Sequence, residues 1–145
     1  MRVSKVVVGA DLLEEHVRGR RAPSVLRVAM GRFLCYTTVF SVIEAFARAA
    51  DGRERLAMMD TVGALKVLGL NAKNALRYAG LFRRHPSVGS LDLLVAGLCC
   101  ESRLPLLTRK VAAFRRIQGL EVLRPEDIMG ARRGATLARP SRSRK

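Results

Sequence analysis

The sequence predicts an α/β fold in which a parallel sheet of four or five strands lies between two layers of helices. Residues 3–8 form a valine-rich run, which is typical of a strand buried on both faces. Short apolar runs then alternate with helical segments along the chain, and this alternation favours parallel strands joined by right-handed crossovers. With 145 residues and 49% hydrophobic residues, the chain is long enough for one domain with a substantial core.

The individual elements follow from apolar runs, helix caps and chain breakers. Apolar runs predict strands at residues 3–8, 33–36, 65–68, 105–107 and 121–123. Helical periodicity predicts helices at residues 12–18, 24–32, 38–51, 54–60, 71–85, from 90 and from 111. Residue types that favour helix N-caps stand at Ser24, Thr38, Asn71 and Ser90.

The charge balance predicts a polyanionic partner. The net charge is +15, and residues 131–145 hold six basic residues and no acid, which leaves +9 on the rest of the chain. Such a surface favours RNA because phosphate neutralisation releases counterions, although purely non-specific contact stays open. With no Trp and only two Tyr, base stacking is a poor binding mode, and backbone contact through Arg is expected. The tail lacks apolar periodicity, so we expect it to be disordered.

Several functional classes are disfavoured by composition. No apolar run approaches the roughly 18 residues needed to span a bilayer, so we expect a cytoplasmic protein without membrane contact. The cysteines, Cys35, Cys99 and Cys100, lie in apolar surroundings without a metal or redox spacing. They are predicted to be reduced core residues.

The most informative stretch is residues 90–120, with the sequence SLDLLVAGLCCESRLPLLTRKVAAFRRIQGL. It places an acid, Asp92, in the first turn of a helix, where the helix dipole favours it. A strand then stops at Thr108, and Phe114 and an Ile-x-Gly-Leu segment follow. Two earlier segments, KVVVGADLLEE and LCYTTVFSVIEAFARAA, each lead from a short strand into a helix.

In order and spacing these segments resemble PIN domains, and VapC-type toxin nucleases in particular, over residues 3–123. The resemblance implies a three-layer α/β/α PIN-like domain over residues 1–130, followed by the basic tail. It also implies that loops at the carboxyl ends of the strands meet at one site. In PIN domains four acids gather there and hold Mg²⁺ or Mn²⁺, which activates a water for attack on phosphorus.

Two of the four acidic positions are changed in this chain. The positions correspond to Gly9, Glu44, Asp92 and Lys110, so that two carboxylates are retained. Asp11 could lean toward the place that Gly9 leaves empty, or it could cap the following helix. If any metal binds, we expect its ligands and the catalytic residues to be Glu44 and Asp92, which the resemblance assigns, together with Asp11, which could replace the missing acid.

Simpler explanations exist for the retained acids. Glu44 could be an exposed helix residue paired with Arg48 four positions later. Asp92 could be only a favourable first-turn acid. We interpret both as site residues because the resemblance places them there.

Lys110 changes the electrostatics of the predicted site. Crowded carboxylates repel one another without a cation, and an ammonium beside Glu44 and Asp92 would neutralise them without supplying a bound water. Lys110 is therefore predicted to replace the metal. Arg109, Arg115 and Arg116 stand near it in sequence and could bind RNA phosphates together with Lys110, or they could be ordinary solvated charges.

Three functions follow as hypotheses. The first is a PIN-like, RNA-binding protein whose catalysis is weakened or lost. The second is an active endoribonuclease, the toxin of a toxin–antitoxin pair, that uses Mg²⁺ or Mn²⁺ at Asp11, Glu44 and Asp92. The third is a structural role, such as a homodimer that sequesters an antitoxin-like protein.

Overall fold

A computed structural model of the chain describes residues 4–19 and 22–130. The strands lie at β1 (Lys5–Val8), β2 (Leu34–Thr38), β3 (Lys66–Leu68), β4 (Leu106–Leu107) and β5 (Val122–Leu123). The helices lie at α1 (Ala10–Arg18), α2 (Val25–Met30), α3 (Val39–Ala47), α4 (Gly52–Gly63), the 3₁₀ turn η1 (Ala72–Asn74), α5 (Ala75–Arg84), α6 (Ser90–Ser102), α7 (Val111–Phe114) and α8 (Pro125–Met129). The predicted tail at residues 131–145 lies outside the described residues.

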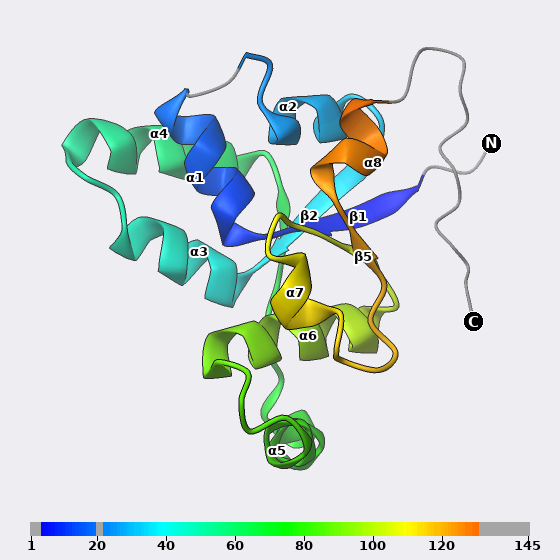
Figure 1. The fold of residues 1–145 in the computed structure, drawn as a ribbon. Coiled ribbons are helices and arrows are strands. Elements are labelled where there is room, and N and C mark those ends of the chain that lie inside the picture. The colour runs from blue at the N-terminus through cyan, green and yellow to red at the C-terminus, as the bar shows by residue number, and fades with distance from the viewer. Residues whose placement is uncertain (1–3, 20–21, 131–145) are drawn as a thin grey trace.

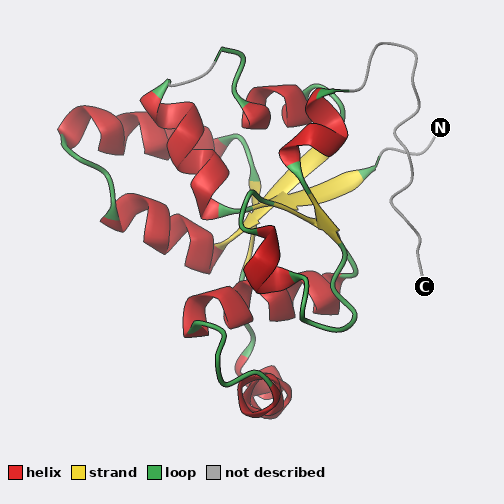
Figure 2. Ribbon diagram, in the orientation of Figure 1, coloured by secondary structure: helices red, strands yellow, loops and turns green. Residues whose placement is uncertain are grey.

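The strands form one parallel sheet in the order β3-β2-β1-β4-β5. Helices cover both of its faces (Figures 1 and 2). This confirms the predicted three-layer fold. Within the described residues, no helix combines the length and the apolar character needed to cross a bilayer.

Strand β1 supplies both hydrophobic cores because successive side chains point to opposite faces of a sheet. Val6 and Val8 pack with α1 and α2 on one face. Val7 packs with α6 and α7 on the other. All three valines are fully buried, so the valine run is the central strand that the sequence predicted.

The predicted helix boundaries need some corrections. The first helix begins at Ala10, earlier than predicted, and α8 was not predicted. The helix predicted over residues 38–51 ends at Ala47, and Asp51 caps the next helix by accepting from the Glu54 N–H at 2.9 Å. The short polar side chain of Asp51 therefore begins a new helix where the sequence predicted one helix to end.

The helix caps were predicted in three of four cases. The side chains of Ser24, Thr38 and Asn71 each accept a backbone N–H of the following turn. The prediction for Ser90 is wrong: Gly89 is the N-cap, and Ser90 is the first helical residue. Asp92 still lies in the first turn of α6.

Helix α5 docks onto α6 at Gly97. A Cβ atom built on Gly97 would lie 2.3 Å from Cε2 of Tyr78. The Tyr78 hydroxyl donates to Glu101 Oε1 at 2.7 Å, and Asn74 donates to the other oxygen of Glu101 at 2.5 Å. The aromatic ring therefore packs against a position that has no room for a side chain.

We predict opposite effects for alanine at two helical glycines. Gly97→Ala should destabilise the protein by about 1–3 kcal/mol because the ring of Tyr78 must move. At Gly80 in α5, a Cβ atom meets only the end of the Arg84 side chain, at 3.4 Å. Gly80→Ala should therefore stabilise by about 0.5–1 kcal/mol. Urea unfolding of both variants checks this, and equal effects would contradict the docking.

Candidate functional site

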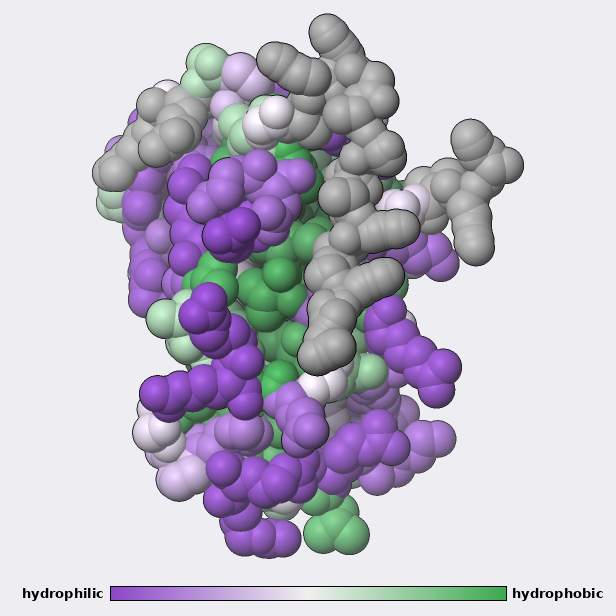
Figure 3. All heavy atoms as spheres, turned by 45° about the vertical axis from the view of Figure 1, so that its right-hand side comes forward, coloured by the Kyte–Doolittle hydropathy of each residue, from purple (hydrophilic) through white to green (hydrophobic). Residues whose placement is uncertain are grey.

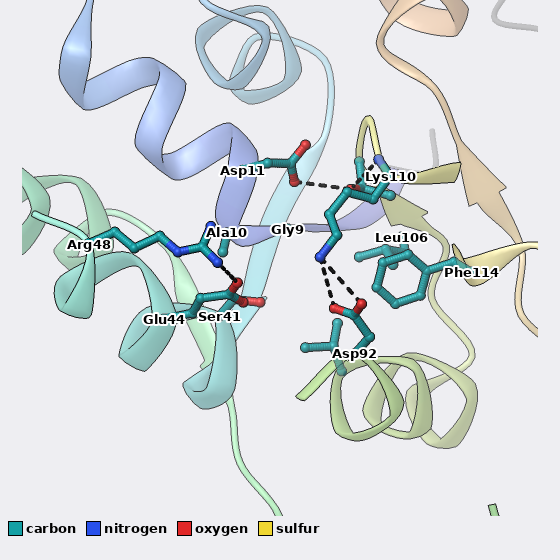
Figure 4. Close-up of a pocket in the computed structure, with 12 residues that line it drawn as sticks. Gly9, Ala10, Asp11, Ser41, Glu44, Arg48, Asp92, Leu106, Lys110 and Phe114 are labelled. Atoms are coloured by element: carbon teal, nitrogen blue, oxygen red, sulfur yellow. Dashed lines mark hydrogen bonds and ion pairs between the residues drawn. The ribbon is translucent and has the colours of Figure 1, made fainter. Parts of the chain in front are cut away.

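A pocket lies at the carboxyl ends of β1 and β4, as the fold class predicts. Its charged lining consists of Asp11, Glu44, Arg48, Asp92 and Lys110. These side chains come from four separate parts of the chain and face one space (Figure 4). The structure therefore brings together the three predicted acids and Lys110.

The register of β1 and β4 sets the geometry of the pocket. Val8 lies opposite Leu107 in the parallel ladder, and the Gly9 N–H donates to the Leu107 carbonyl at 3.1 Å. Each strand then turns at once, into α1 on one side and through residues 108–110 into α7 on the other. Two segments about a hundred residues apart thus meet directly.

Asp11 binds the 108–110 turn. Its Oδ1 accepts from the Thr108 hydroxyl at 3.0 Å, and its Oδ2 accepts from the Arg109 N–H at 2.9 Å. Its Oδ1 also lies 2.9 Å from the position of a Cβ atom on Gly9. Asp11 thus leans toward the place left empty by Gly9, and the alternative that it caps α1 is wrong because Gly9 is the N-cap.

Asp92 is paired with Lys110. The Lys110 ammonium lies 3.1 Å and 3.3 Å from the two carboxylate oxygens of Asp92. The Asp92 side chain is 19% exposed and that of Lys110 is 46% exposed, so the pair lies at the mouth of the pocket. Lys110 reaches across from its turn to α6 (Figure 4).

Glu44 is paired with Arg48, the C-cap residue of its own helix. Arg48 Nη2 lies 3.1 Å from Glu44 Oε2, the helical spacing that the simpler explanation predicted. The Glu44 side chain is only 16% exposed, however, and it lines the pocket. The expectation that Lys110 also neutralises Glu44 is not met, since Arg48 does so.

Arg48 extends the charge pairing to an acid that the sequence analysis missed. Its Nη1 lies 3.7 Å from Glu14 Oε2, and Arg18 lies 3.5 Å from the other oxygen of Glu14. Burial raises the pKa of Glu14, and the two arginines oppose this rise. The spacing of Glu14 and Arg18 along α1 was the signal available in the sequence.

The predicted substrate-binding arginines differ in their surroundings. Arg109 donates to Glu15 Oε2 at 2.6 Å and is thereby held against α1. Arg115 and Arg116 are exposed after α7, and neither forms an ion pair with any residue that the structure describes. Arg109 is therefore paired within the protein, whereas no ion pair to a described residue holds the other two.

The residues present do not fit the divalent metal that PIN domains hold. Each pocket carboxylate already binds an internal partner: Asp11 the turn, Glu44 an arginine and Asp92 a lysine. Position 9 contributes no side-chain oxygen, since it is a glycine. Within residues 4–19 and 22–130, no group of three or more His, Cys, Asp or Glu side chains is arranged to hold an ion.

Comparison with known proteins was informative only at the level of structure. No family model matches the sequence, and no curated protein matches it significantly. Among solved structures, VapBC2 from Rickettsia felis, bound to a DNA fragment from its promoter, matches with a TM-score of 0.69 at 15% identity. That match covers 83% of this chain and 98% of the other.

Two further structures give the same result. A toxin–antitoxin complex from Klebsiella pneumoniae has a TM-score of 0.68 at 17% identity, over 83% of this chain and 97% of the other. VapBC-1 from nontypeable Haemophilus influenzae has a TM-score of 0.66 at 17% identity, over 83% of this chain and 98% of the other. The chain therefore has the PIN-like α/β/α fold of VapC-type proteins, as its sequence predicted.

Proposed function

We propose that this protein binds RNA through phosphate contacts and does not hydrolyse it by the metal-dependent route of PIN nucleases. The observation that carries the proposal is the Lys110 ammonium, 3.1 Å and 3.3 Å from the oxygens of Asp92. It supplies positive charge at a carboxylate where a metal nuclease would need a cation. An ammonium carries no water ligand, so it offers no activated nucleophile.

The distribution of charge supports a nucleic-acid partner. Residues 61–91 contain five basic residues and no acid, and residues 102–120 likewise contain five and none. These stretches include α5 and α7, which lie on the same side of the molecule as α6 (Figure 1). Hydrophilic side chains dominate the lower part of the face in Figure 3, at the level of α5 and α6.

Phosphate binding would depend on the two predicted arginines that form no ion pair with a described residue. Arg115 and Arg116 follow α7, next to the turn that carries Lys110. A guanidinium matches two phosphate oxygens at once, and each neutralised phosphate releases counterions. Lys110 would contribute as a weaker contact, since its charge is shared with Asp92.

The second candidate function is an active Mg²⁺- or Mn²⁺-dependent endoribonuclease. It is favoured by one observation: Asp11, Glu44 and Asp92 all line the same pocket. Catalysis there would require Lys110 to leave Asp92 and Asp11 to release the turn.

An antitoxin-like partner is proposed from the toxin–antitoxin complexes among the structural neighbours. The homodimer stays a prediction.

We predict that RNA binding falls steeply with salt and depends on Arg115 and Arg116. Replacing both with Ala should weaken binding and reduce the slope of log K against log salt by about 1–2, as expected for two lost phosphate contacts. Arg53→Ala with Arg55→Ala is the matched control, because both are exposed on α4 and remove the same charge. Fluorescence anisotropy with single-stranded RNA gives the slopes. Equal loss in both double variants, or a slope near zero, would contradict the proposal.

We also predict that the protein has no EDTA-sensitive ribonuclease activity and no saturable Mn²⁺ site in isothermal titration. The physical reason is that each pocket carboxylate is already neutralised or hydrogen-bonded. Asp92→Ala, purified in the same way, controls for contaminating nuclease. Cleavage that EDTA abolishes and that Asp92→Ala lacks would establish the second candidate function instead.

A further inference from the structure

We infer that Asp11 is a positioning residue: its carboxylate holds the 108–110 turn so that Lys110 lies on Asp92, and it can do so only because position 9 has no side chain. The inference builds on the proposed neutralisation of Asp92 by Lys110 and explains how the chain maintains it. It assigns Asp11 a role other than that of a metal ligand.

The hold on the turn is made of consecutive hydrogen bonds. The Thr108 hydroxyl donates to Asp11 at 3.0 Å, and its oxygen, Thr108 Oγ1, accepts from the Lys110 N–H at 3.1 Å. Between them, the Arg109 N–H donates to the second oxygen of Asp11 at 2.9 Å. All three residues of the turn are thereby connected to one carboxylate, two directly and Lys110 through Thr108.

A second contact ties the same turn to the same helix. Arg109 Nη2 lies 2.6 Å from Glu15 Oε2, one helical turn beyond Asp11. Glu15 in turn accepts the N–H of Val25 at the start of α2. The turn is therefore fixed against α1, and the Lys110 side chain extends from it to Asp92 on α6.

Position 9 must be small for this arrangement to exist. Gly9 has φ −80° and ψ 167°, which any residue adopts, so the backbone does not require glycine here. Space does. A Cβ atom would lie 2.9 Å from Asp11 Oδ1 and 3.4 Å from Thr108 Oγ1. A side chain at position 9 and the observed orientation of Asp11 thus exclude each other.

The test is a double-mutant cycle read at Asp92 by NMR, without RNA or metal. The side-chain carboxyl ¹³C signal of Asp92 is recorded for the wild type, Asp11→Ala, Lys110→Met and the double variant. We expect Asp11→Ala to move the Asp92 signal in the same direction as Lys110→Met. The shift of the Asp92 signal in the double variant should equal the shift in Lys110→Met alone, because Asp11 acts through Lys110.

Two further variants separate positioning from general destabilisation. Asp11→Asn keeps one acceptor oxygen, so its Asp92 signal should lie between those of the wild type and Asp11→Ala. Asp60→Ala removes an exposed acid from α4 and should leave the signal unchanged. The Arg109 amide signal reports directly on loss of its bond to Asp11.

The outcomes distinguish this inference from the proposed function. If Lys110→Met moves the Asp92 signal and Asp11→Ala does not, the positioning role of Asp11 is wrong while the Lys110–Asp92 pair stands. If Lys110→Met itself leaves the signal unchanged, the proposed pairing fails as well. An Asp92 signal that responds to Asp11→Ala equally with and without Lys110 would indicate direct coupling and overturn the inference.

The requirement at position 9 has its own test. Gly9→Ala should lower Tm by a few degrees and shift the Arg109 amide and Asp92 signals, because the new methyl displaces the carboxylate of Asp11. In the Asp11→Ala background, the same change should have a smaller effect on Tm and leave those signals unmoved. Equal losses of Tm in the two backgrounds would show that the methyl does not act through Asp11.

Discussion

The pairing of β1 with β4 is the constraint on which the rest of the site depends. Because Val8 and Leu107 lie opposite each other in a parallel ladder, the residues that follow them leave the sheet at the same point. Asp11 and the 108–110 turn are then within hydrogen-bonding distance. A change of register would separate them and move Lys110 away from α6.

The pocket satisfies its charges internally. Each carboxylate binds a partner within the protein: Asp11 and Asp92 bind donors of the 108–110 turn, and Glu44 binds Arg48 four positions later. An acid left unpaired at this depth would be costly. The ion pairing extends beyond the pocket at Arg48, which contacts both a pocket acid, Glu44, and the partly buried Glu14. In this respect the site resembles a structural ion-pair network more than an open cation site. The RNA contacts that we propose are outside the pocket lining, at Arg115 and Arg116, which form no ion pair with any described residue.

Much of the architecture was predictable because valine-rich runs and cap residues are local signals. Helix α8 was missed because five residues carry little periodicity. The N-cap of α6 was assigned wrongly to Ser90 because a polar residue beside Gly89 could serve equally as the cap or as the first helical residue. The proximity of Lys110 to Asp92 was predictable through the resemblance. The Glu44–Arg48 pair and the leaning of Asp11 toward Gly9 were predictable only as alternatives, because the choice between the alternatives depends on side-chain directions that no spacing encodes.

The crowding at Gly9 also bears on how this protein can evolve. An acid introduced at position 9 would meet the carboxylate of Asp11, and an acid introduced at position 110 would face Asp92 without a counter-charge. Each single step toward a more acidic pocket is therefore opposed by a neighbour that suits the present arrangement. Selection for such a pocket would have to pass through less stable intermediates.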